Sequence, residues 1–345
     1  MLANRVAELP LGDDWIFEPK WDGFRTLIFR DRDELFIQSR DEKPLDRYFP
    51  ELVEVLKAQL PEQCVLDGEI VIAREGRLDF DALQLRLHPA ASRVQKLSVA
   101  LPASVVFFDL LWLGDDDYRD VPFSQRRAAL ESLRDSLSPP LHITPATRDH
   151  TVADDWFKRF EGAGLDGVMA KRESTLYQPN KRVMLKVKHE RDCDCVVGGF
   201  RWHKGSDGTA VGSLLLGLYD DEGHLEHVGV CASFTAAKRR ELVEFLAPYR
   251  ENALENHPWK SWVEHDAGHR KPGAQSRWSA GKDLSWEPLR PELVVEVAYD
   301  HMQSGRFRHT AQFRRWRTDK KPLDCTFAQL EVVPPEELAT IFAND

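Results

Sequence analysis

The feature that most constrains the fold of this chain is a change of pattern near residue 190. Before it, apolar runs such as "FRTLIFR" and "SVVFFDLLWL" alternate with runs of helical spacing such as "ELVEVLKAQL". After it, "CVVGGFRWHKGSDGTAVGSLLLGLYDDEGHLEHVGVCASF" reads as strands separated by glycine turns. A chain of 345 residues also exceeds the usual size of one core. We therefore predict two domains, 1–190 and 191–345.

The first domain is predicted to mix strands and helices without a regular βαβ repeat, which favours an α+β fold over a doubly wound sheet. Asp46 and Ser124 are the candidate caps of the helices at 47–60 and 125–137. The other predicted helices are 79–87 and 152–164. The predicted strands are 14–17, 24–30, 34–40, 64–73, 104–113, 141–146, 166–172 and 184–190.

The second domain is predicted to be a small β-barrel of the oligonucleotide-binding (OB) type. One helical run, "TAAKRRELVEFLAPY", stands between short strands, and further strands start at "ELVVEVAYDH". The Trp-rich segment 257–286 has two interpretations, a surface loop with partly buried tryptophans or a nucleic-acid contact.

Charge and cysteine content exclude several classes of protein. The net charge of −10 argues against a protein that coats nucleic acid, but residues 301–321, here called the basic strip, hold seven Lys or Arg and one acid. Five scattered cysteines indicate reduced thiols.

No run approaches the roughly 20 apolar residues of a membrane span, and no secretion signal is recognised at the start. We expect a cytoplasmic protein with no membrane partner.

The segment "EPKWDGFR" places Lys20 beside acidic, glycine and arginine residues. A lysine acts as a covalent nucleophile only as a neutral amine, so it needs cations or a metal nearby to lower its pKa. Arg25, Lys186 and Lys188 are candidates, and the last two alternate along one predicted strand face. Such lysines repel each other unless an anion lies between them, and a phosphate is the obvious anion. Alone, the segment also fits a charged turn.

An ordered series of further segments follows Lys20. They are "SR" at 39–40, "LDGEIV" at 66–71, "FFDLLWL" at 107–113, "LDGVMAKR" at 165–172, "LKVK" at 185–188 and "FRRWRTDK" at 313–320. Over nearly the whole chain this series resembles the ATP-dependent DNA ligases, within the lysine nucleotidyltransferases, and is most similar to the compact bacterial C-type ligases.

The resemblance implies a fold and a reaction. The fold would be a nucleotidyltransferase (adenylation) domain of antiparallel sheets and helices, followed by an OB-fold domain. Lys20 would attack the α-phosphorus of ATP to form lysyl-AMP. The adenylyl group would then pass to a DNA 5′-phosphate, and a 3′-hydroxyl would expel AMP and seal a nick in duplex DNA.

The resemblance also implies a role for each candidate site residue. Glu18 would contact the adenine edge, and Phe108 would stack on the base, although a buried strand would also bury a phenylalanine. Arg25 and Arg40 would hold ribose or phosphate oxygens. Lys186 and Lys188 would grip the α-phosphate, with Lys171 structural or near phosphate. Arg317, Asp319 and Lys320 would contact the departing pyrophosphate when the second domain closes over the first. Without the resemblance, the segment 313–320 reads as a solvated basic face.

Two carboxylates would bind Mg²⁺ or Mn²⁺. Glu69 would hold a ribose hydroxyl or the metal. Asp166 stands where the family commonly has glutamate. Because its side chain is one methylene shorter, it would bind the metal either directly or through water.

Three functions are therefore weighed. A DNA ligase that works in DNA repair is favoured over an RNA ligase or a GTP-using capping enzyme, and over a catalytically dead nucleic-acid clamp. We expect a monomer that works at the bacterial nucleoid and is open to recruitment by repair proteins.

Overall fold

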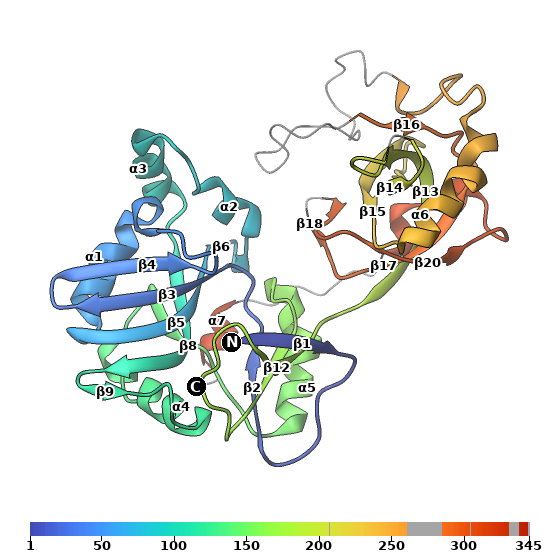
Figure 1. Ribbon diagram of the computed structural model, residues 1–345. Helices are drawn as coiled ribbons and strands as arrows, with labels where there is room; N and C mark the ends of the chain where they lie inside the picture. Colours follow the sequence, from blue (N-terminus) through green and yellow to red (C-terminus); the bar gives the residue numbers. More distant parts are fainter. Residues whose placement is uncertain (207, 261–284, 304, 331–337, 344–345) are drawn as a thin grey trace. The chain divides into compact units, whose positions relative to one another are not determined.

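The computed structural model describes residues 1–206, 208–260, 285–303, 305–330 and 338–343. The chain divides into two compact units, Met1–Lys188 with Val333–Asp345, and His189–Val332. Residues 338–343 fall within the predicted second domain, 191–345. They form helix α7 (Leu338–Ala343), whose Leu338 and Ile341 are buried in a core of the first unit (Figure 1).

The first unit contains two sheets. The smaller has the order β1-β12-β11-β2, with the bounds Leu2–Val6 (β1), Trp15–Pro19 (β2), Val168–Arg172 (β11) and Arg182–Val187 (β12). The larger has the order β10-β8-β5-β3-β4, with the bounds Phe24–Asp31 (β3), Glu34–Ser39 (β4), Gln63–Val71 (β5), Ser104–Leu113 (β8) and Leu141–Ile143 (β10). In these two orders the neighbours are antiparallel, except for the parallel pairs β1–β12 and β10–β8.

Helices cover these sheets because apolar side chains of the helices pack against the apolar faces of the strands. Ile28, Leu66 and Phe107 from the larger sheet share one core with residues of α1 (Pro50–Gln59), α2 (Phe80–Leu85) and α4 (Phe123–Glu131). The smaller sheet packs with α5 (His150–Arg159). Along β3, buried Thr26 and Ile28 alternate with half-buried neighbours, so the opposite face of the larger sheet remains available for a site.

Two predicted helix caps are wrong. Asp46 starts a short 3₁₀ turn, and α1 begins at Pro50 after Phe49 with no side-chain cap. Helix α4 begins at Phe123, so Ser124 lies inside the helix. Pro50 supplies a start signal by another route, since its fixed φ suits the first helical turn.

Several elements of the first unit were not predicted from the sequence. They include β1, α3 (Ala91–Ala100), the two-residue strands β7 (Arg77–Leu78) and β9 (Asp116–Asp117), and α7.

The second unit has the predicted succession of strands with one helix between them. Its sheet runs β15-β14-β13-β17-β20, and α6 (Ala236–Leu246) packs on its core. The strands are Arg191–Trp202 (β13), Val211–Tyr219 (β14), Leu225–Cys231 (β15), Val294–Tyr299 (β17) and Gln312–Trp316 (β20), and Glu287–Pro288 (β16) pairs with β13. The Trp-rich segment lies largely outside the described residues, but Trp259 is buried in this core.

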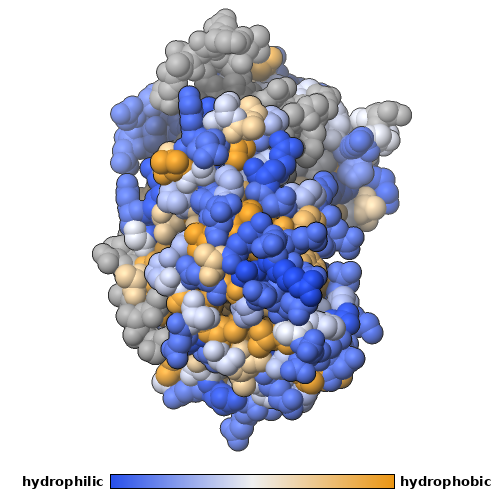
Figure 2. Space-filling model, turned by 90° about the vertical axis from the view of Figure 1, so that its left-hand side faces the viewer, coloured by the Kyte–Doolittle hydropathy of each residue, from blue (hydrophilic) through white to orange (hydrophobic). Residues whose placement is uncertain are grey.

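The cysteines agree with the prediction of reduced thiols. All five cysteines are free and buried. The face in Figure 2 is mostly hydrophilic, with apolar residues in small groups. Among the described helices, none is long and apolar enough to cross a membrane.

Candidate active site

Lys20 follows strand β2 and is held by its backbone against the turn before β11. Its N–H donates to the Gly167 carbonyl at 2.8 Å, and its carbonyl accepts from the Asp166 N–H at 2.9 Å. Gly167 has φ +135°, and a Cβ there would lie 2.0 Å from the Val187 carbonyl oxygen. Only glycine fits this approach, so the glycine fixes the turn that faces Lys20.

The Asp166 carboxylate bridges two lysines. Its Oδ2 lies 2.5 Å from the Nζ of Lys20 and 2.7 Å from the Nζ of Lys188. Burial raises the pKa of Asp166, but the charges and hydrogen bonds of the two ammonium groups outweigh this and hold the pKa below its ordinary value. An anion was predicted between Lys186 and Lys188, whereas the Asp166 carboxylate of the protein itself lies between Lys20 and Lys188.

A cavity of about 340 Å³ opens beside Lys20. Eight of the predicted site residues line it: Glu18, Lys20, Arg25, Arg40, Glu69, Phe108, Lys171 and Lys186. The pKa of Lys186 is lowered by burial and by the charges of Lys20 and Lys188. Residues that are up to 168 positions apart in the sequence therefore surround one space.

One end of this cavity combines an aromatic ring with a buried ion pair. The Nζ of Lys171 lies 2.6 Å from Oε2 of Glu18 and donates to the Phe108 carbonyl at 3.1 Å. The same Nζ lies 4.9 Å from the centre of the Phe108 ring. A flat ring beside fixed polar groups suits a nucleobase.

Arg25 and Glu69 mark the part of the cavity on the larger sheet. The Arg25 guanidinium is engaged with Asp67, with distances of 3.0 Å from Nε to Oδ1 and 2.6 Å from a terminal nitrogen to Oδ2. Glu69 accepts from the Gly23 N–H at 3.1 Å. Burial, helped by the nearby Asp67 charge and only partly offset by Lys20 and Arg25, raises the pKa of Glu69 to about 7. A carboxylate in this situation gains from an added cation.

Arg317, Asp319 and Lys320 belong to the second unit, where they join one ion-pair cluster. Arg317 pairs with Asp319 at 2.9 Å and with Asp194 at 2.9 Å, and Lys320 pairs with the same Asp194 at 2.9 Å. The run that reads as a solvated basic face is therefore largely neutralised by acids from its own unit.

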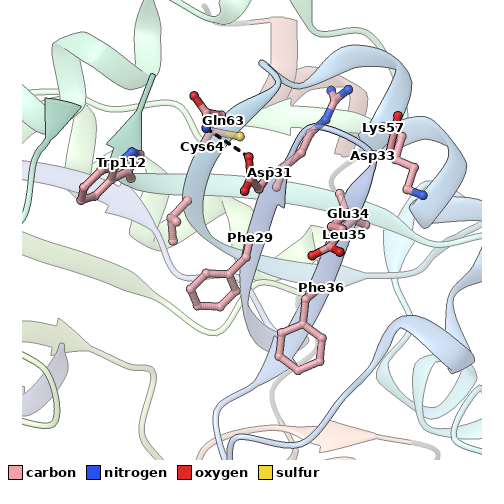
Figure 3. A pocket seen from close by; sticks show the side chains of 12 residues that line it. Phe29, Asp31, Asp33, Glu34, Leu35, Phe36, Lys57, Gln63, Cys64 and Trp112 are labelled. Carbon is pink, nitrogen blue, oxygen red and sulfur yellow. Dashed lines mark hydrogen bonds between the residues drawn. The ribbon is translucent and has the colours of Figure 1, made fainter. Parts of the chain in front are cut away.

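A larger cavity, of about 680 Å³, lies at the other end of the larger sheet. Figure 3 shows Phe29 and Phe36 on the same side of the sheet, with Asp31 and Gln63 joined by a hydrogen bond. Its lysine, Lys57, comes from α1. The lining lacks the set of converging lysines that surrounds Lys20, so we assign the chemistry to the smaller cavity.

Two polar partners of the site, Asp67 and Arg127, were not predicted from the sequence. Asp67 stands inside the "LDGEIV" segment, two residues before Glu69, so a β-strand period would have placed it on the same face. Arg127 lies on α4 and reaches Glu18, and its run "SQRRAALE" has no feature that distinguishes it from a solvated helix face.

Comparisons with known proteins point to one family. Residues 1–188 match the family described as ATP dependent DNA ligase domain, and residues 207–320 match ATP dependent DNA ligase C terminal region. The chain is 55% identical to DNA ligase C2 of Mycolicibacterium smegmatis, over 99% of this chain and 96% of that protein. It is also 55% identical to DNA ligase C of Mycobacterium tuberculosis, over 96% and 93%.

More distant relatives extend the comparison. The multifunctional non-homologous end joining protein LigD of Mycolicibacterium smegmatis is 31% identical over 89% of this chain, which spans 36% of that protein. A solved structure of a Lig E DNA ligase matches with a TM-score of 0.55 and 16% identity, over 92% of this chain and 100% of that chain, a likeness of fold. The expected fold, an adenylation domain with a C-terminal OB-like domain, is confirmed.

Proposed function

We propose, since this chain belongs to the ATP-dependent DNA ligases, that Lys20 is the residue that carries the adenylyl group while the enzyme seals nicks in duplex DNA. The observation that supports this most directly is the position of Lys20. Its Nζ lies at a cavity with an aromatic and acidic end, among Lys186, Lys188 and the Asp166 carboxylate. Of the functions weighed from the sequence, DNA ligase is confirmed at the level of the family.

The proposed reaction has three transfers at phosphorus. The Nζ of Lys20 loses a proton and attacks the α-phosphorus of ATP; a P–N bond forms and the P–O bond to pyrophosphate breaks. An oxygen of the DNA 5′-phosphate then attacks the same phosphorus, so the P–N bond breaks and Nζ regains a proton. Finally the 3′-hydroxyl attacks the DNA phosphorus and AMP leaves. The protein's contribution is chiefly positioning and charge compensation.

Each cavity residue takes a role that suits its chemistry. We assign the adenine to the end formed by Glu18, Phe108 and Lys171. Arg25 and Arg40 face the ribose and phosphates, while Lys186 and Lys188 compensate charge at the α-phosphate. For the cluster of Arg317, Asp319 and Lys320 we propose contacts to the pyrophosphate, as the family resemblance implies.

A divalent metal, Mg²⁺ or Mn²⁺, fits the carboxylates beside Lys20. Glu69 suits it because burial and Asp67 raise the pKa of this carboxyl, so a hard cation would stabilise its charged form. Asp166 would be the second group to hold the metal, directly or through water, and its Oδ2 pairs with the ammonium groups of Lys20 and Lys188 in this structure. When bound, the metal would neutralise phosphate oxygens and favour the neutral amine of Lys20.

The setting of the enzyme is also proposed. We place it in the bacterial cytoplasm at the nucleoid, as a monomer that repair proteins can recruit. Its similarity to a protein named for non-homologous end joining supports a role in DNA repair.

The decisive experiment compares Lys20→Ala with the wild type. Incubation with labelled ATP, Mg²⁺ and a nicked duplex should give a labelled protein and sealed DNA only for the wild type, with sealing by the variant lowered at least about a thousandfold. Lys57→Ala, which removes a lysine from the other cavity, is the matched control and should behave as wild type.

A second substrate separates the covalent step from DNA binding. A nick that already carries AMP on its 5′-phosphate needs no lysine nucleophile, so Lys20→Ala should still seal it without ATP. Equal sealing of the ordinary nick by Lys20→Ala and by the wild type would refute the covalent role of Lys20.

A further inference from the structure

We propose that Arg127, a residue of helix α4, is a positioning residue that holds both flanks of Lys20 and thereby sets the preference of the enzyme for adenine. This inference rests on the proposed function, because it assumes that the adenine lies at the end of the cavity lined by Glu18. Arg127 is 7% exposed and does not line the cavity. It would therefore act through the residues that it contacts.

The first contact of Arg127 is with the residue two positions before the nucleophile. One terminal nitrogen of its guanidinium donates to Oε1 of Glu18 at 3.2 Å. Glu18 is 2% exposed, and its other oxygen, Oε2, pairs with Lys171 at 2.6 Å. The Glu18 carboxylate is thus fixed between two cations. Lys171 also holds the Phe108 carbonyl, so the acidic group and the stacking ring are tied into one network.

The second contact of Arg127 reaches the residue one position after the nucleophile. The other terminal nitrogen donates to the Thr144 carbonyl at 2.6 Å, and it also pairs with Glu131 one helical turn along α4. The Thr144 hydroxyl accepts from the indole N–H of Trp21 at 2.8 Å. Trp21 lines the cavity beside Lys20. A single buried guanidinium therefore connects to both sides of the nucleophile.

Electrostatics explains why this arrangement matters for selectivity. A buried carboxylate that loses one of two cationic partners must rotate, take up a proton or admit water, because an incompletely paired buried charge is costly. Adenine offers an exocyclic amine as a hydrogen-bond donor, whereas hypoxanthine has a carbonyl oxygen at that position. A fixed carboxylate accepts from the amine and repels the carbonyl. Loosening Glu18 should weaken that discrimination more than it weakens binding of the shared triphosphate.

The test measures formation of lysyl-AMP or lysyl-IMP at varied concentrations of ATP or inosine triphosphate. For Arg127→Met we expect the preference for ATP over inosine triphosphate to fall about tenfold or more. The KM for ATP should rise by a similar factor, with a smaller change in kcat. Arg127→Lys, which keeps the charge but can reach fewer partners at once, should be intermediate. Arg134→Gln is the matched control, because Arg134 pairs with the same Glu131 at 2.6 Å, and it should keep the wild-type preference.

The outcomes separate this inference from the proposed function. If the wild type forms no adenylate on Lys20, the proposed function fails. If it forms one but shows no preference for ATP, or if Arg127→Met keeps that preference, only the inference is overturned. Equal losses with both nucleotides would indicate a merely structural role and also overturn it. Should Arg127→Met fail to fold, an unchanged preference in Arg127→Lys would likewise overturn the inference.

Discussion

For Asp166, the type of side chain and its place in the site could be predicted from the sequence, but its contacts could not. The sequence identifies a carboxylate next to Gly167 and predicts a metal ligand, bound either directly or through water. The structure adds that the short side chain accepts from Lys20 and Lys188 at one oxygen. Lysines 168 residues apart in the sequence meet there, and no local pattern specifies such a meeting. The metal contact itself stays a prediction.

The ionisation of Glu69 leads to a prediction about stability. Because the pKa of its carboxyl rises from 4.5 to about 7 on folding, the folded state favours the protonated form. The stabilisation from that proton is present at low pH and is lost as the pH rises through about 7, at a cost of up to about 3 kcal/mol. Glu69→Gln mimics the neutral form. Without metal, it should therefore unfold at a higher urea concentration than the wild type at pH 8.

The control for this prediction is the same measurement at pH 5, where the difference in unfolding midpoint should shrink. Adenylation by Glu69→Gln should be impaired at both pH values if the carboxylate binds metal. If the wild type and Glu69→Gln unfold at the same urea concentration at pH 8, the ionisation of Glu69 does not destabilise the folded protein, which contradicts the prediction.

At the scale of the element, the turn that joins Asp166 to β11 is the most constrained segment of the site. Gly167→Ala would force a Cβ against the Val187 carbonyl and impose an unfavourable φ. We expect a loss of about 1–3 kcal/mol in the free energy of unfolding and a slower adenylation step, because both backbone hydrogen bonds of Lys20 end on this turn. Urea unfolding and single-turnover labelling measure the two effects.

Gly114→Ala is the control for the turn, since Gly114 also has a positive φ, of +58°, but has no atom within 4 Å of an added Cβ. It should lose some stability and leave adenylation unchanged. Similar adenylation rates in Gly167→Ala and the wild type would argue that the turn does not position Lys20.

Elements with strong local signals could be predicted, and those without them could not. Strands β3, β5 and β8 were found because their apolar runs are long. Strand β1 is only five residues long and lacks a clear apolar alternation, and it pairs with β12, far along the chain. Helix α3 starts after Ala90 without a side-chain cap. Ser124 has the chemistry of a cap but lies two residues after the actual N-cap position, which Pro122 occupies.

At the scale of the whole molecule, the number of Lys and Arg residues in the basic strip overstates the positive charge that the strip offers to DNA. Of its cations, Arg314, Arg315, Arg317 and Lys320 pair with acids of the second unit, and those acids were not visible as partners in the sequence. The sequence could give the number of cations, but only the folded sheet brings Asp194 and Glu296 beside them.

Binding to nicked duplex should still weaken steeply with salt, because Lys and Arg of the strip and of the first unit would displace counterions. Lys321 is exposed, so Lys321→Gln should reduce the slope of log K against log salt by about 1. Arg315→Gln should reduce it less, because Arg315 pairs with Glu296 at 2.8 Å. Titrations at several salt concentrations check this, and salt-independent binding would contradict it.

Helix α7 has a consequence for how the two units are joined. The polypeptide leaves the first unit after Lys188 and is part of it again at Leu338, whose N–H donates to the Gly76 carbonyl at 2.8 Å. The second unit is thus an insertion with two covalent tethers. Cleavage of either tether alone would leave the second unit attached through the other.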